Sequence, residues 1–395
     1  MRGFAVMCAC LLAAGIIESW FHTRRLSKMP VRVHVNGIRG KSTTARLIAA
    51  GLRAGGLRTI GKTTGTAARI IWEDGSEEPV VRRGNWANIS EQMSLVRLAH
   101  SRGADAIVVE CMALQPENQW VAERHMIRST VGVITNVRDD HLDVMGPSAR
   151  DVAHSLALTI PYGGDLVTAE EGFLPVFEQR AHRTGASVHA VRATDVPDDV
   201  ALAFDYINFP ENVACALKVC ELCGVSRDVA LEGMLGATGD PGAARVLRLD
   251  RDLAPYVLVN AFAANDRDST ALVCKAAEAK TAHFTLDGLP AIVILNNRSD
   301  RPSRAGELAQ FVAEEIDPEW VFVVGEAGRV AMRGLAGGGV DRAIIVNLTL
   351  QRNTERVLRS IAERCPRGAV VYGVGNTRGI GEGIIQYFEA NGVSL

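Results

Sequence analysis

A glycine-rich stretch near the N-terminus, VHVNGIRGKSTTARL at residues 33–47, has the composition of a phosphate-binding loop. The common form of such a loop is G-x-x-x-x-G-K-[ST]. Here the spacing is shorter, because Gly37 stands only three residues before Gly40. The stretch leaves an expected strand and enters an expected helix, which is the context that phosphate binding needs. We therefore interpret residues 37–43 as a nucleotide loop of a different class.

The residue types in this loop suit nucleotide chemistry. Glycines can adopt positive φ and let backbone N–H groups point at phosphate oxygens. Lys41 offers a charge for the β- and γ-phosphates, and Ser42 or Thr43 offers a hydroxyl for Mg²⁺. The loop thus predicts ATP and Mg²⁺ as cofactors. The alternative is a glycine turn before a capped helix, which G-K-S-T-T at a strand–helix junction disfavours.

Two other expected strands end in groups that can bind a metal. The strand at 104–110 closes on Glu110, and the strand at 129–136 runs into the segment TNVRDDHLDVMG, which holds His141. Ligands of open parallel sheets bind beyond the carboxyl ends of the strands, so these groups are expected to meet the loop. Carboxylates and an imidazole beside phosphates predict one or two Mg²⁺ ions. Taken alone, Glu110 could form a strand-end salt bridge, and His141 could be a capping or satisfied histidine.

Strand-like and helix-like stretches alternate along the rest of the chain, which predicts an α/β fold with parallel sheets. A second such series, from PAIVILN at 290–296 to AVVYGVG at 369–375, reads as a Rossmann-like unit. Gly and Pro residues at 236–256 mark the join. We expect a P-loop central domain at 30–235 and a C-terminal Rossmann-like α/β domain at 236–395.

The N-terminal residues differ from this pattern, because residues 3–17 carry no charge. A helix over 3–21 would be about 28 Å long, close to the thickness of a bilayer core. Basic residues follow the apolar run, which favours that flank being cytoplasmic. We expect a transmembrane anchor with a basic flank at 1–29, in the cell membrane, with the catalytic body on the cytoplasmic side. A secretory signal peptide and a buried helix are the alternatives.

Composition excludes some classes of function. The 395 residues are 47% hydrophobic and 22% charged, as in globular proteins, and the net charge is −2. The chain therefore has no excess of basic residues that would suggest bulk nucleic-acid binding. The eight cysteines lack paired metal-binding spacings, so we interpret them as reduced core thiols of a body that faces the cytosol.

The loop, Glu110 and the segment ITNVRDDHLD resemble the central-domain motifs of the Mur ligase superfamily, ATP-dependent amide ligases that include folylpolyglutamate synthases. Within that group the resemblance is closer to the ligase subunits of poly-γ-glutamate synthases, the PgsB/CapB family. Further similar segments span nearly the whole chain: IGKTTGTAAR (60–69), NISEQ (88–92), VECMALQPE (109–117), PENVACAL (210–217), GDPGAARVL (239–247), VNAFAANDRDST (259–270) and VYGVGNTRG (371–379).

The resemblance implies that Lys41, Glu110 and His141 are catalytic. It implies that Ser42 binds one Mg²⁺, and that Glu110 and His141 bind a second one bridging the γ-phosphate and the acceptor carboxylate. Many relatives carry a carbamylated lysine for this metal about ten residues beyond D-H-x-D. Alignment with the family motif places Leu156 near that position, so the second metal must be held differently, or less tightly, here.

The same resemblance implies a wider set of nucleotide-binding residues. In the first domain these are Gly37, Arg39, Gly40, Lys41, Ser42, Thr43 and, near the adenine edge, Asn212. In the second domain they are Arg298, Asp300 and Arg301, with Asn265 and Asp266 lining the same cleft. The alternatives for the second-domain groups are a solvated loop and a turn.

The implied reaction is polymerisation of glutamate through its γ-carboxylate. ATP phosphorylates the carboxylate, and an amine attacks the acyl phosphate. The implied partners are glutamate, the growing poly-γ-glutamate chain, the membrane and small membrane subunits of a synthase and export complex, and a homo-oligomer is compatible with this interpretation. Basic candidates for the polyanion, with a solvated face as the alternative, are Lys62, Arg69, Arg82, Arg83 and Arg97. Two other functions stay open: a membrane-tethered NTPase without ligation, and a folylpolyglutamate-type ligase.

Overall fold

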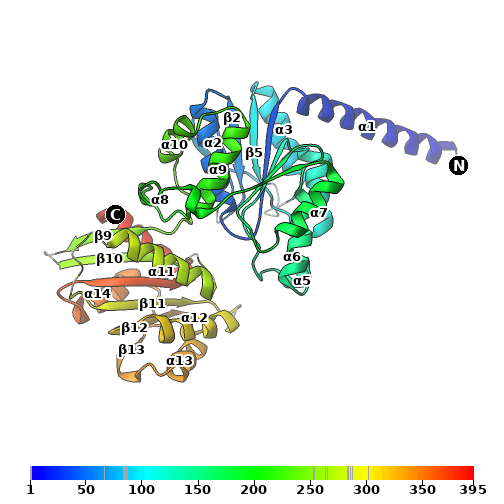
Figure 1. The fold of residues 1–395 in the computed structure, drawn as a ribbon. Helices are drawn as coiled ribbons and strands as arrows, with labels where there is room; N and C mark the ends of the chain where they lie inside the picture. The colour runs from blue at the N-terminus through cyan, green and yellow to red at the C-terminus, as the bar shows by residue number, and fades with distance from the viewer. Residues whose placement is uncertain are drawn as a thin grey trace. The chain divides into compact units, whose positions relative to one another are not determined.

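The computed structural model describes residues 2–65, 67–82, 88–251, 254–262, 264, 266–282, 284, 286, 288–300 and 302–395. The chain forms two compact units, each built around its own sheet (Figure 1). The first unit comprises residues 1–203 and 208–241, and the second comprises residues 204–207 and 242–395. The predicted α/β class with parallel-rich sheets is confirmed.

The centre of the first sheet positions the predicted site. Strand β1 (Val31–Asn36) lies between β5 (Ala106–Glu110) and β6 (Val131–Ile134), and both pairings are parallel. Val35 pairs with Glu110 in this register. The side chains of β5 are buried throughout, which explains its continuous β-branched run. The carboxyl ends of all three strands therefore lie at one edge of the sheet.

Flanking strands extend the first sheet in the order β4-β3-β2-β5-β1-β6-β7-β8. The parallel ones are β2 (Thr59–Thr63), β7 (Asp165–Thr168) and β8 (Ser187–Ala190). The antiparallel strands β3 (Arg69–Ile71) and β4 (Glu77–Pro79), of which β4 is the edge strand, were not predicted. Each is only three residues long, with the sequence RII in β3 and EEP in β4, which is too short to show an apolar alternation.

Helices cover both faces of this sheet (Figure 1). They are α2 (Lys41–Ala54), α3 (Glu91–Ser101), α4 (Pro116–Val121) with a π-helical continuation (Ala122–Ile127), α5 (Leu142–Met145), α6 (Ala149–Leu156), α7 (Leu174–Thr184), α8 (Asp198–Leu202), α9 (Pro210–Leu222) and α10 (Arg227–Leu235). Short 3₁₀ turns occupy Ala157–Thr159 and Ala193–Asp195.

Helix α2, which follows the phosphate loop, is held by close packing. Its residues Leu47, Ile48 and Leu52 are fully buried, and it contacts α9 and α10. At Gly51 an added Cβ would stand 2.7 Å from the sulfur of Cys220 on α9, so only glycine allows this approach. The helix thereby holds the loop at its N-terminus in a fixed position.

The second unit contains a sheet in the order β13-β12-β11-β14-β10-β9-β15. Its strands are β9 (Val246–Arg251), β10 (Ala254–Ala261), β11 (Ala291–Asn297), β12 (Trp320–Gly325), β13 (Ile345–Asn347), β14 (Ala369–Gly375) and β15 (Val393–Ser394). Its helices are α11 (Arg267–Thr281), α12 (Pro302–Glu315), α13 (Gly328–Gly337), α14 (Thr354–Arg364) and α15 (Ile380–Asn391), with a 3₁₀ turn at Arg342–Ile344.

The antiparallel pair β9–β10 corrects the sequence interpretation of this region. The segment 236–256 was expected to be a join, whereas β9 and the start of β10 already belong to the second sheet. Strand β10 pairs in parallel with β14 and contributes Leu258, which is fully buried in the core. The glycines that suggested a join lie before β9, whereas Pro255 belongs to β10 itself.

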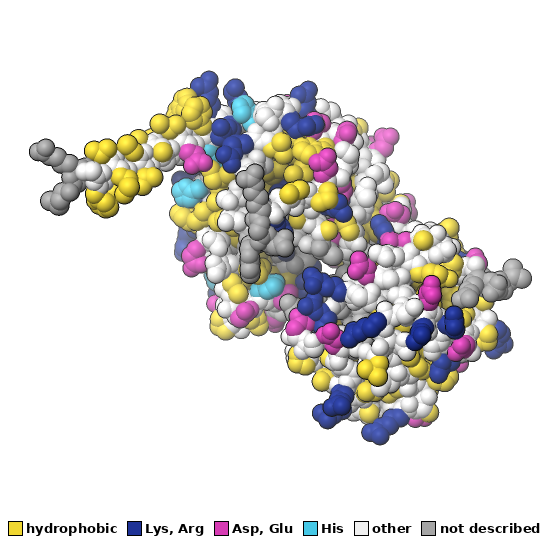
Figure 2. Space-filling model, turned by 180° about the vertical axis from the view of Figure 1, so that it is seen from behind, with side chains coloured by type: hydrophobic (Ala, Val, Ile, Leu, Met, Phe, Trp, Pro, Cys, Tyr) yellow, Lys and Arg dark blue, Asp and Glu magenta, His cyan; other side chains and the backbone are white. Residues whose placement is uncertain are grey.

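The N-terminal helix α1 (Arg2–Leu26) is exposed along most of its length and apolar (Figure 2). Among the described residues, Gly3–Leu26 is the helix long and apolar enough to cross a membrane, by length and composition. Its last turns dock onto the first unit, where His22 Nε2 lies 2.8 Å from the carbonyl oxygen of Met126 and Leu26 is buried. Two of the expected core thiols, Cys8 and Cys10, lie on this helix and not in a core.

Candidate active site

The phosphate loop needs glycine at both of its glycine positions. Gly37 has φ 127° and Gly40 has φ 80°, values that favour glycine. An added Cβ on Gly37 would lie 2.1 Å from Thr135 Oγ1, and one on Gly40 would lie 2.3 Å from Asn212 Oδ1. The short loop is therefore packed closely on both sides, and a side chain at either glycine would displace it.

Residues that follow β6 hold the loop in shape. Thr135 Oγ1 donates to the carbonyl oxygen of Arg39 at 2.6 Å, and Asn136 Oδ1 accepts from Arg39 N at 3.0 Å. The Arg39 guanidinium pairs with Asp140 at 3.1 Å. Both residues belong to the I-T-N motif, but the sequence predicted no role for Thr135 or Asn136. Their contribution was hidden because these contacts join residues almost a hundred positions apart.

The loop lysine and serine face the first acidic strand end. Ser42 Oγ donates to Glu110 Oε2 at 2.8 Å, and Thr64 N donates to the same oxygen at 2.6 Å. Lys41 Nζ donates to the carbonyl oxygens of Gly37 at 2.8 Å and Ile38 at 3.2 Å. Burial lowers the pKa of Lys41, and the nearby Arg39 adds to this while Glu110 opposes it. The lysine is therefore folded over the loop, where phosphate oxygens would meet it.

One cavity of about 280 Å³ brings the predicted catalytic residues together. Lys41, Glu110 and His141 all line it. His141 has φ 54°, a left-handed conformation, and its side chain is 39% exposed. Its Nε2 atom lies 3.9 Å from Asp140 Oδ2, so the ring is not locked in a core. The other lining residues are Asn36, Gly37, Ile38, Thr64, Gly65, Arg82, Cys111, Met112, Ala113, Leu114 and Met145.

The donors at the cavity fit a hard cation. Ser42 Oγ and Glu110 Oε2 are neighbouring oxygen atoms, and oxygen ligands together with phosphate oxygens suit Mg²⁺. No group of three or more His, Cys, Asp or Glu side chains within the described part of the chain is arranged to hold a metal by itself. The residues present therefore fit a metal whose remaining ligands come from the nucleotide and water.

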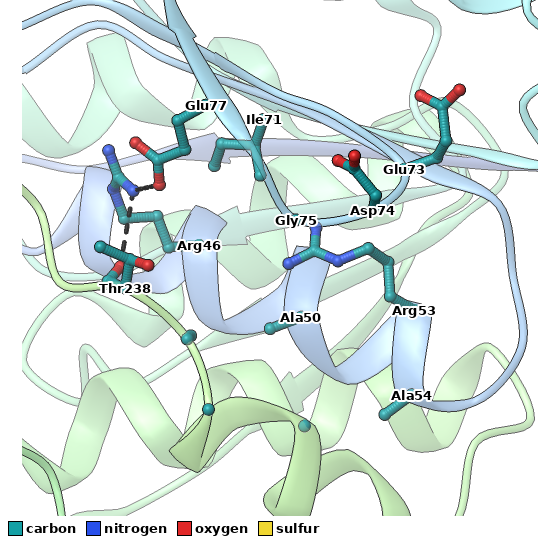
Figure 3. A pocket seen from close by; sticks show the side chains of 13 residues that line it. Arg46, Ala50, Arg53, Ala54, Ile71, Glu73, Asp74, Gly75, Glu77 and Thr238 are labelled. Carbon is teal, nitrogen blue, oxygen red and sulfur yellow. Dashed lines mark hydrogen bonds and ion pairs between the residues drawn. The ribbon is translucent and has the colours of Figure 1, made fainter.

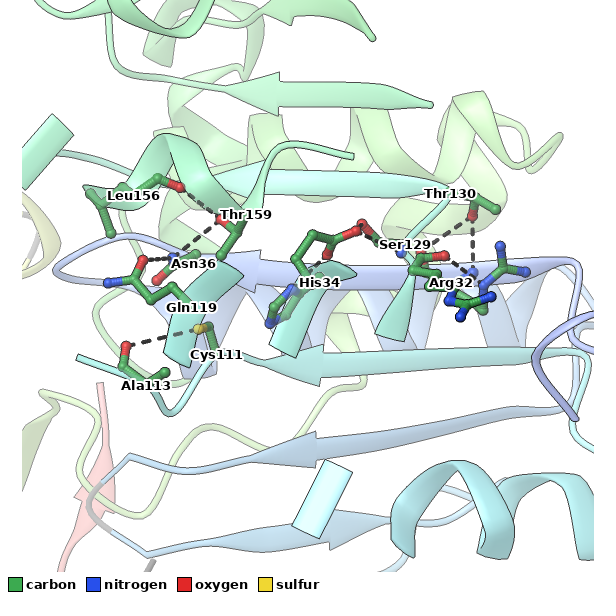
Figure 4. A network of polar contacts seen from close by, with 12 residues as sticks. Arg32, His34, Asn36, Cys111, Ala113, Gln119, Ser129, Thr130, Leu156 and Thr159 are labelled. Carbon is green, nitrogen blue, oxygen red and sulfur yellow. Dashed lines mark hydrogen bonds and ion pairs between the residues drawn. The ribbon is translucent and has the colours of Figure 1, made fainter. Parts of the chain in front are cut away.

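A buried polar network fixes β1 behind the loop (Figure 4). His34 Nδ1 lies 2.8 Å from Glu123 Oε2, and both side chains are buried. Ser129 donates to the other Glu123 oxygen from its N and Oγ atoms, each at 2.9 Å. Burial favours the neutral imidazole, but interactions with Cys111 and Glu123 outweigh it and raise the pKa of His34 to about 10. Sequence reasoning missed this pair, because its partners are 89 residues apart.

Asn36, the last residue of β1, connects this buried network to the phosphate loop. Asn36 Oδ1 accepts from Gly37 N at 2.9 Å, and Asn36 Nδ2 donates to Gln119 Oε1 at 2.9 Å. Both side chains are buried. The amide of Asn36 therefore connects helix α4 to the first glycine of the loop.

Two further expectations in the first unit concern Asn212 and Leu156. Asn212 is buried at the start of α9, and its Oδ1 accepts from Thr44 Oγ1 at 3.3 Å. It packs against Gly40, while its role at an adenine edge stays a prediction. Leu156 is fully buried in a hydrophobic core. The position matched to the family lysine is thus an apolar core position in this chain.

The predicted residues of the second unit form local contacts. Arg298 and Asp300 pair with each other at 2.7 Å and are both exposed. Asp266 caps helix α11, accepting from Ser269 N at 2.8 Å. Arg301 and Asn265 lie outside the described residues. The nucleotide-binding role of all these residues stays a prediction.

The basic candidates for a polyanion do not form one group. Lys62 Nζ and Arg82 Nε each lie 2.9 Å from a different oxygen of Glu91, and Arg82 lines the cavity. Arg97 is exposed on α3. Arg69 lies on strand β3, and Arg83 falls outside the described residues. The structure therefore singles out Arg82 and, behind it, Lys62.

A second pocket of about 410 Å³ lies along α2, away from the loop (Figure 3). Arg46, which is 2% exposed, pairs there with Glu77 and lies 3.6 Å from Asp240 Oδ1. Arg53 also points into it, and burial lowers the pKa of its guanidinium against the opposing effect of Asp74. The residues lining this pocket include none of the predicted site residues.

Known proteins match both units. Residues 35–156 match the Mur ligase middle domain, and residues 246–391 match the poly-gamma-glutamate synthase CapB C-terminal domain. The PGA synthase CapB of Bacillus subtilis (strain 168) is 36% identical over 382 residues, 96% of each chain. The capsule biosynthesis protein CapB of Bacillus anthracis is 38% identical over 376 residues, 95% of this chain and 80% of that protein.

Solved structures share the fold at low identity. A folylpolyglutamate synthase from Thermotoga maritima has a TM-score of 0.62 at 13% identity and covers 98% of each chain. A bifunctional folylpolyglutamate synthase/dihydrofolate synthase from Yersinia pestis, complexed with AMPPNP and Mn ion, has a TM-score of 0.65 at 17% identity, covering 94% of this chain and 92% of that one. The resemblance drawn from the motifs is thus confirmed: this chain belongs to the CapB family of poly-γ-glutamate synthases, amide ligases with a Mur ligase middle domain.

Proposed function

We propose that this chain uses ATP and Mg²⁺ to phosphorylate the γ-carboxylate of a glutamyl unit, and that the amine of another glutamyl unit then attacks the acyl phosphate. The single observation that supports this most strongly is the shared cavity, which Lys41, Glu110 and His141 line from three neighbouring strand ends. Phosphate binding, metal binding and a flexible polar side chain are thereby available at one cavity, as carboxylate activation requires.

In this proposal Lys41 neutralises the transferring phosphoryl group. It now bonds to carbonyl oxygens of Gly37 and Ile38, and phosphate oxygens would replace them. Burial strengthens the attraction between its charge and an anion, because the local dielectric constant is low. The backbone N–H groups of residues 37–43 and the N-terminus of α2 add partial positive charge.

Ser42 and Glu110 would hold the metal. The metal would neutralise negative charge and so reduce the repulsion between ATP and the carboxylate. His141, on the opposite strand end of the same cavity, is proposed to reach the γ-phosphate or the acceptor carboxylate. Its left-handed backbone presents the ring to the cavity. Because His141 is partly exposed, it can move onto a substrate without breaking a core.

We further propose that α1 anchors the chain in the cell membrane as a single pass with the first unit on the cytoplasmic side. Its apolar length and exposure support this, and Arg24 and Arg25 in its last turn suit a cytoplasmic flank. Small membrane subunits and a second copy of this chain are proposed partners. Deleting residues 1–21, which spares His22, should move the protein from the membrane fraction to the soluble fraction; an unchanged distribution would refute the anchor.

Activity is tested by ADP formation in membranes that contain the full chain. We expect ADP formation to depend on glutamate and an oligo-γ-glutamate acceptor, and to be accompanied by chain elongation. Folate–glutamate acceptors serve as the control for a folylpolyglutamate-type reaction. ADP formation that ignores glutamate, without polymer, would instead indicate an NTPase without ligation.

A further inference from the structure

The cavity contains a basic group that the proposed chemistry does not use. Arg82 lines it and is 25% exposed, and its Nε donates to Glu91 Oε1 at 2.9 Å. The other Glu91 oxygen accepts from Lys62 Nζ at 2.9 Å. Lys62 is 2% exposed. Two cations thus share one carboxylate at this wall of the cavity.

This cluster lies beside the acidic strand end. Lys62 belongs to β2, which pairs with β5 so that Lys62 is opposite Val109, the neighbour of Glu110. Lys62 interacts electrostatically with both Glu110 and Arg82. The cluster therefore belongs to the Glu110 side of the cavity, whereas Lys41 approaches from the phosphate loop.

Arg82 is prepared to bind an additional anion. Only its Nε atom is occupied by Glu91, and within the described part of the chain its terminal nitrogens Nη1 and Nη2 make no hydrogen bond. A guanidinium held at one nitrogen keeps its planar edge for a carboxylate, which it binds in a bidentate manner. The terminal nitrogens of Arg82 can therefore bind an anionic ligand while its Nε atom stays bonded to Glu91.

The proposed substrate carries such an anion at a suitable distance. The glutamyl unit whose γ-carboxylate is activated also has an α-carboxylate, and the two carboxyl carbons are at most about 5 Å apart, given C–C bonds of about 1.5 Å. A cavity of 280 Å³ is near the lower limit of ligand pockets, about 300 Å³. It suits the end of a chain, held at both carboxylates, better than a large group.

We propose that Arg82 binds the α-carboxylate of the glutamyl unit that is being activated, with Glu91 and Lys62 as positioning residues, and that this contact selects the γ-carboxylate for phosphorylation. The inference rests on the proposed function, and its test takes the case in which the γ-carboxylate at the end of the chain is the one activated. In that case, the activated unit carries an α-carboxylate beside its γ-carboxylate.

The test removes the α-carboxylate from the substrate and the guanidinium from the protein in turn. One acceptor is an oligo-γ-glutamate, and the other is the same oligomer ending in 4-aminobutyrate, which keeps the γ-carboxylate and lacks the α-carboxylate. The kcat/KM for ADP formation is measured with both acceptors for the full chain in membranes. The variants are Arg82→Gln, Arg82→Lys and the control Arg192→Gln, which breaks an exposed Arg–Glu pair with Glu171.

The unaltered chain should prefer the glutamate-ended acceptor roughly 10- to 100-fold, the range of one charge-assisted contact. Arg82→Gln should bring this ratio close to one by lowering kcat/KM for the glutamate-ended acceptor alone, and Arg82→Lys should fall between. Arg192→Gln should keep the full ratio.

Two results would overturn the inference while leaving the proposed function intact. One is an Arg82→Gln variant that keeps the preference. The other is an Arg82→Gln variant whose kcat/KM falls equally with both acceptors, since Arg82 would then merely support Glu91. If the unaltered chain forms no ADP with any glutamyl acceptor, the proposed function itself fails.

Discussion

The first unit has two polar pockets along the same helix, and they differ in how their cations are satisfied. At the start of α2, Lys41 bonds to backbone carbonyls and faces a cavity. Further along α2, Arg46 is paired with Glu77 and Asp240. A cation with neutral partners can exchange them for a ligand, whereas a buried cation between carboxylates holds the fold. Pocket volume alone would have favoured the second pocket as the active site, because it is larger than the cavity at Lys41.

The largest expected effect is the loss of catalysis when the cation of the first pocket, Lys41, is replaced. Lys41→Ala should lower glutamate-dependent ADP formation by about 10³-fold or more, because a direct phosphate contact is lost. Arg53→Ala, on the same helix but in the second pocket, is the matched control and should keep most of the activity. If the two variants showed the opposite pattern, the assignment of the pockets would be reversed.

Replacing the buried cation of the second pocket should lower the stability of the fold. Arg46→Met leaves Glu77 and Asp240 without their buried cation, and breaking such a pair destabilises by about 3 kcal/mol. Urea unfolding measures this as a lower midpoint. The folded fraction should still turn over ATP. A loss of turnover without a change in the midpoint would show that this pocket takes part in catalysis.

His141→Ala should act on turnover rather than on folding. We expect about a 10²-fold fall in activity, as for the loss of one group that stabilises the transferring charge. The unfolding midpoint should change little, because the side chain is 39% exposed. A protein that unfolds on this substitution would identify His141 as a structural residue.

The last prediction concerns the pH dependence of the network behind the loop. The folded-state pKa of His34 is raised from 6.5 to about 10, so its stabilising contribution is complete below pH 6.5 and is lost as pH rises towards 10. The free energy of unfolding should fall across this window by at most about 1.4 kcal/mol per pH unit. Urea titrations of His34→Gln should lack this slope, and a slope identical to that of the unaltered chain would disprove the assignment.

Much of the fold was predictable because its central strands are buried on both faces and read as continuous apolar runs. The family was predictable because the loop, Glu110 and His141 stand in short local motifs, and the comparisons confirm it. Strands β3 and β4 were missed because three residues are too few to show an apolar pattern. The pair of β9 and β10 was missed because glycines before it resembled a linker.

The details of the site depended on contacts that no local pattern encodes. Thr135 and Asn136, which follow β6, hold the phosphate loop through hydrogen bonds to Arg39. His34 pairs with Glu123, which lies on a π-helical turn. A sequence can reveal which residue types are present but not which of them meet across a sheet. The apolar Leu156 was the reverse case, since the sequence already showed that the family lysine was missing.

The central claim is that ATP phosphorylates a glutamyl γ-carboxylate in the cavity at Lys41. It is tested most directly with an oligo-γ-glutamate acceptor whose γ-carboxylate oxygens are labelled with ¹⁸O. When the amine attacks the acyl phosphate, the carbon–oxygen bond breaks, and the phosphate leaves with one acceptor oxygen. We therefore predict one ¹⁸O atom in each phosphate released per amide bond formed. Phosphate without label would mean that water or another route cleaves ATP, and would contradict the account.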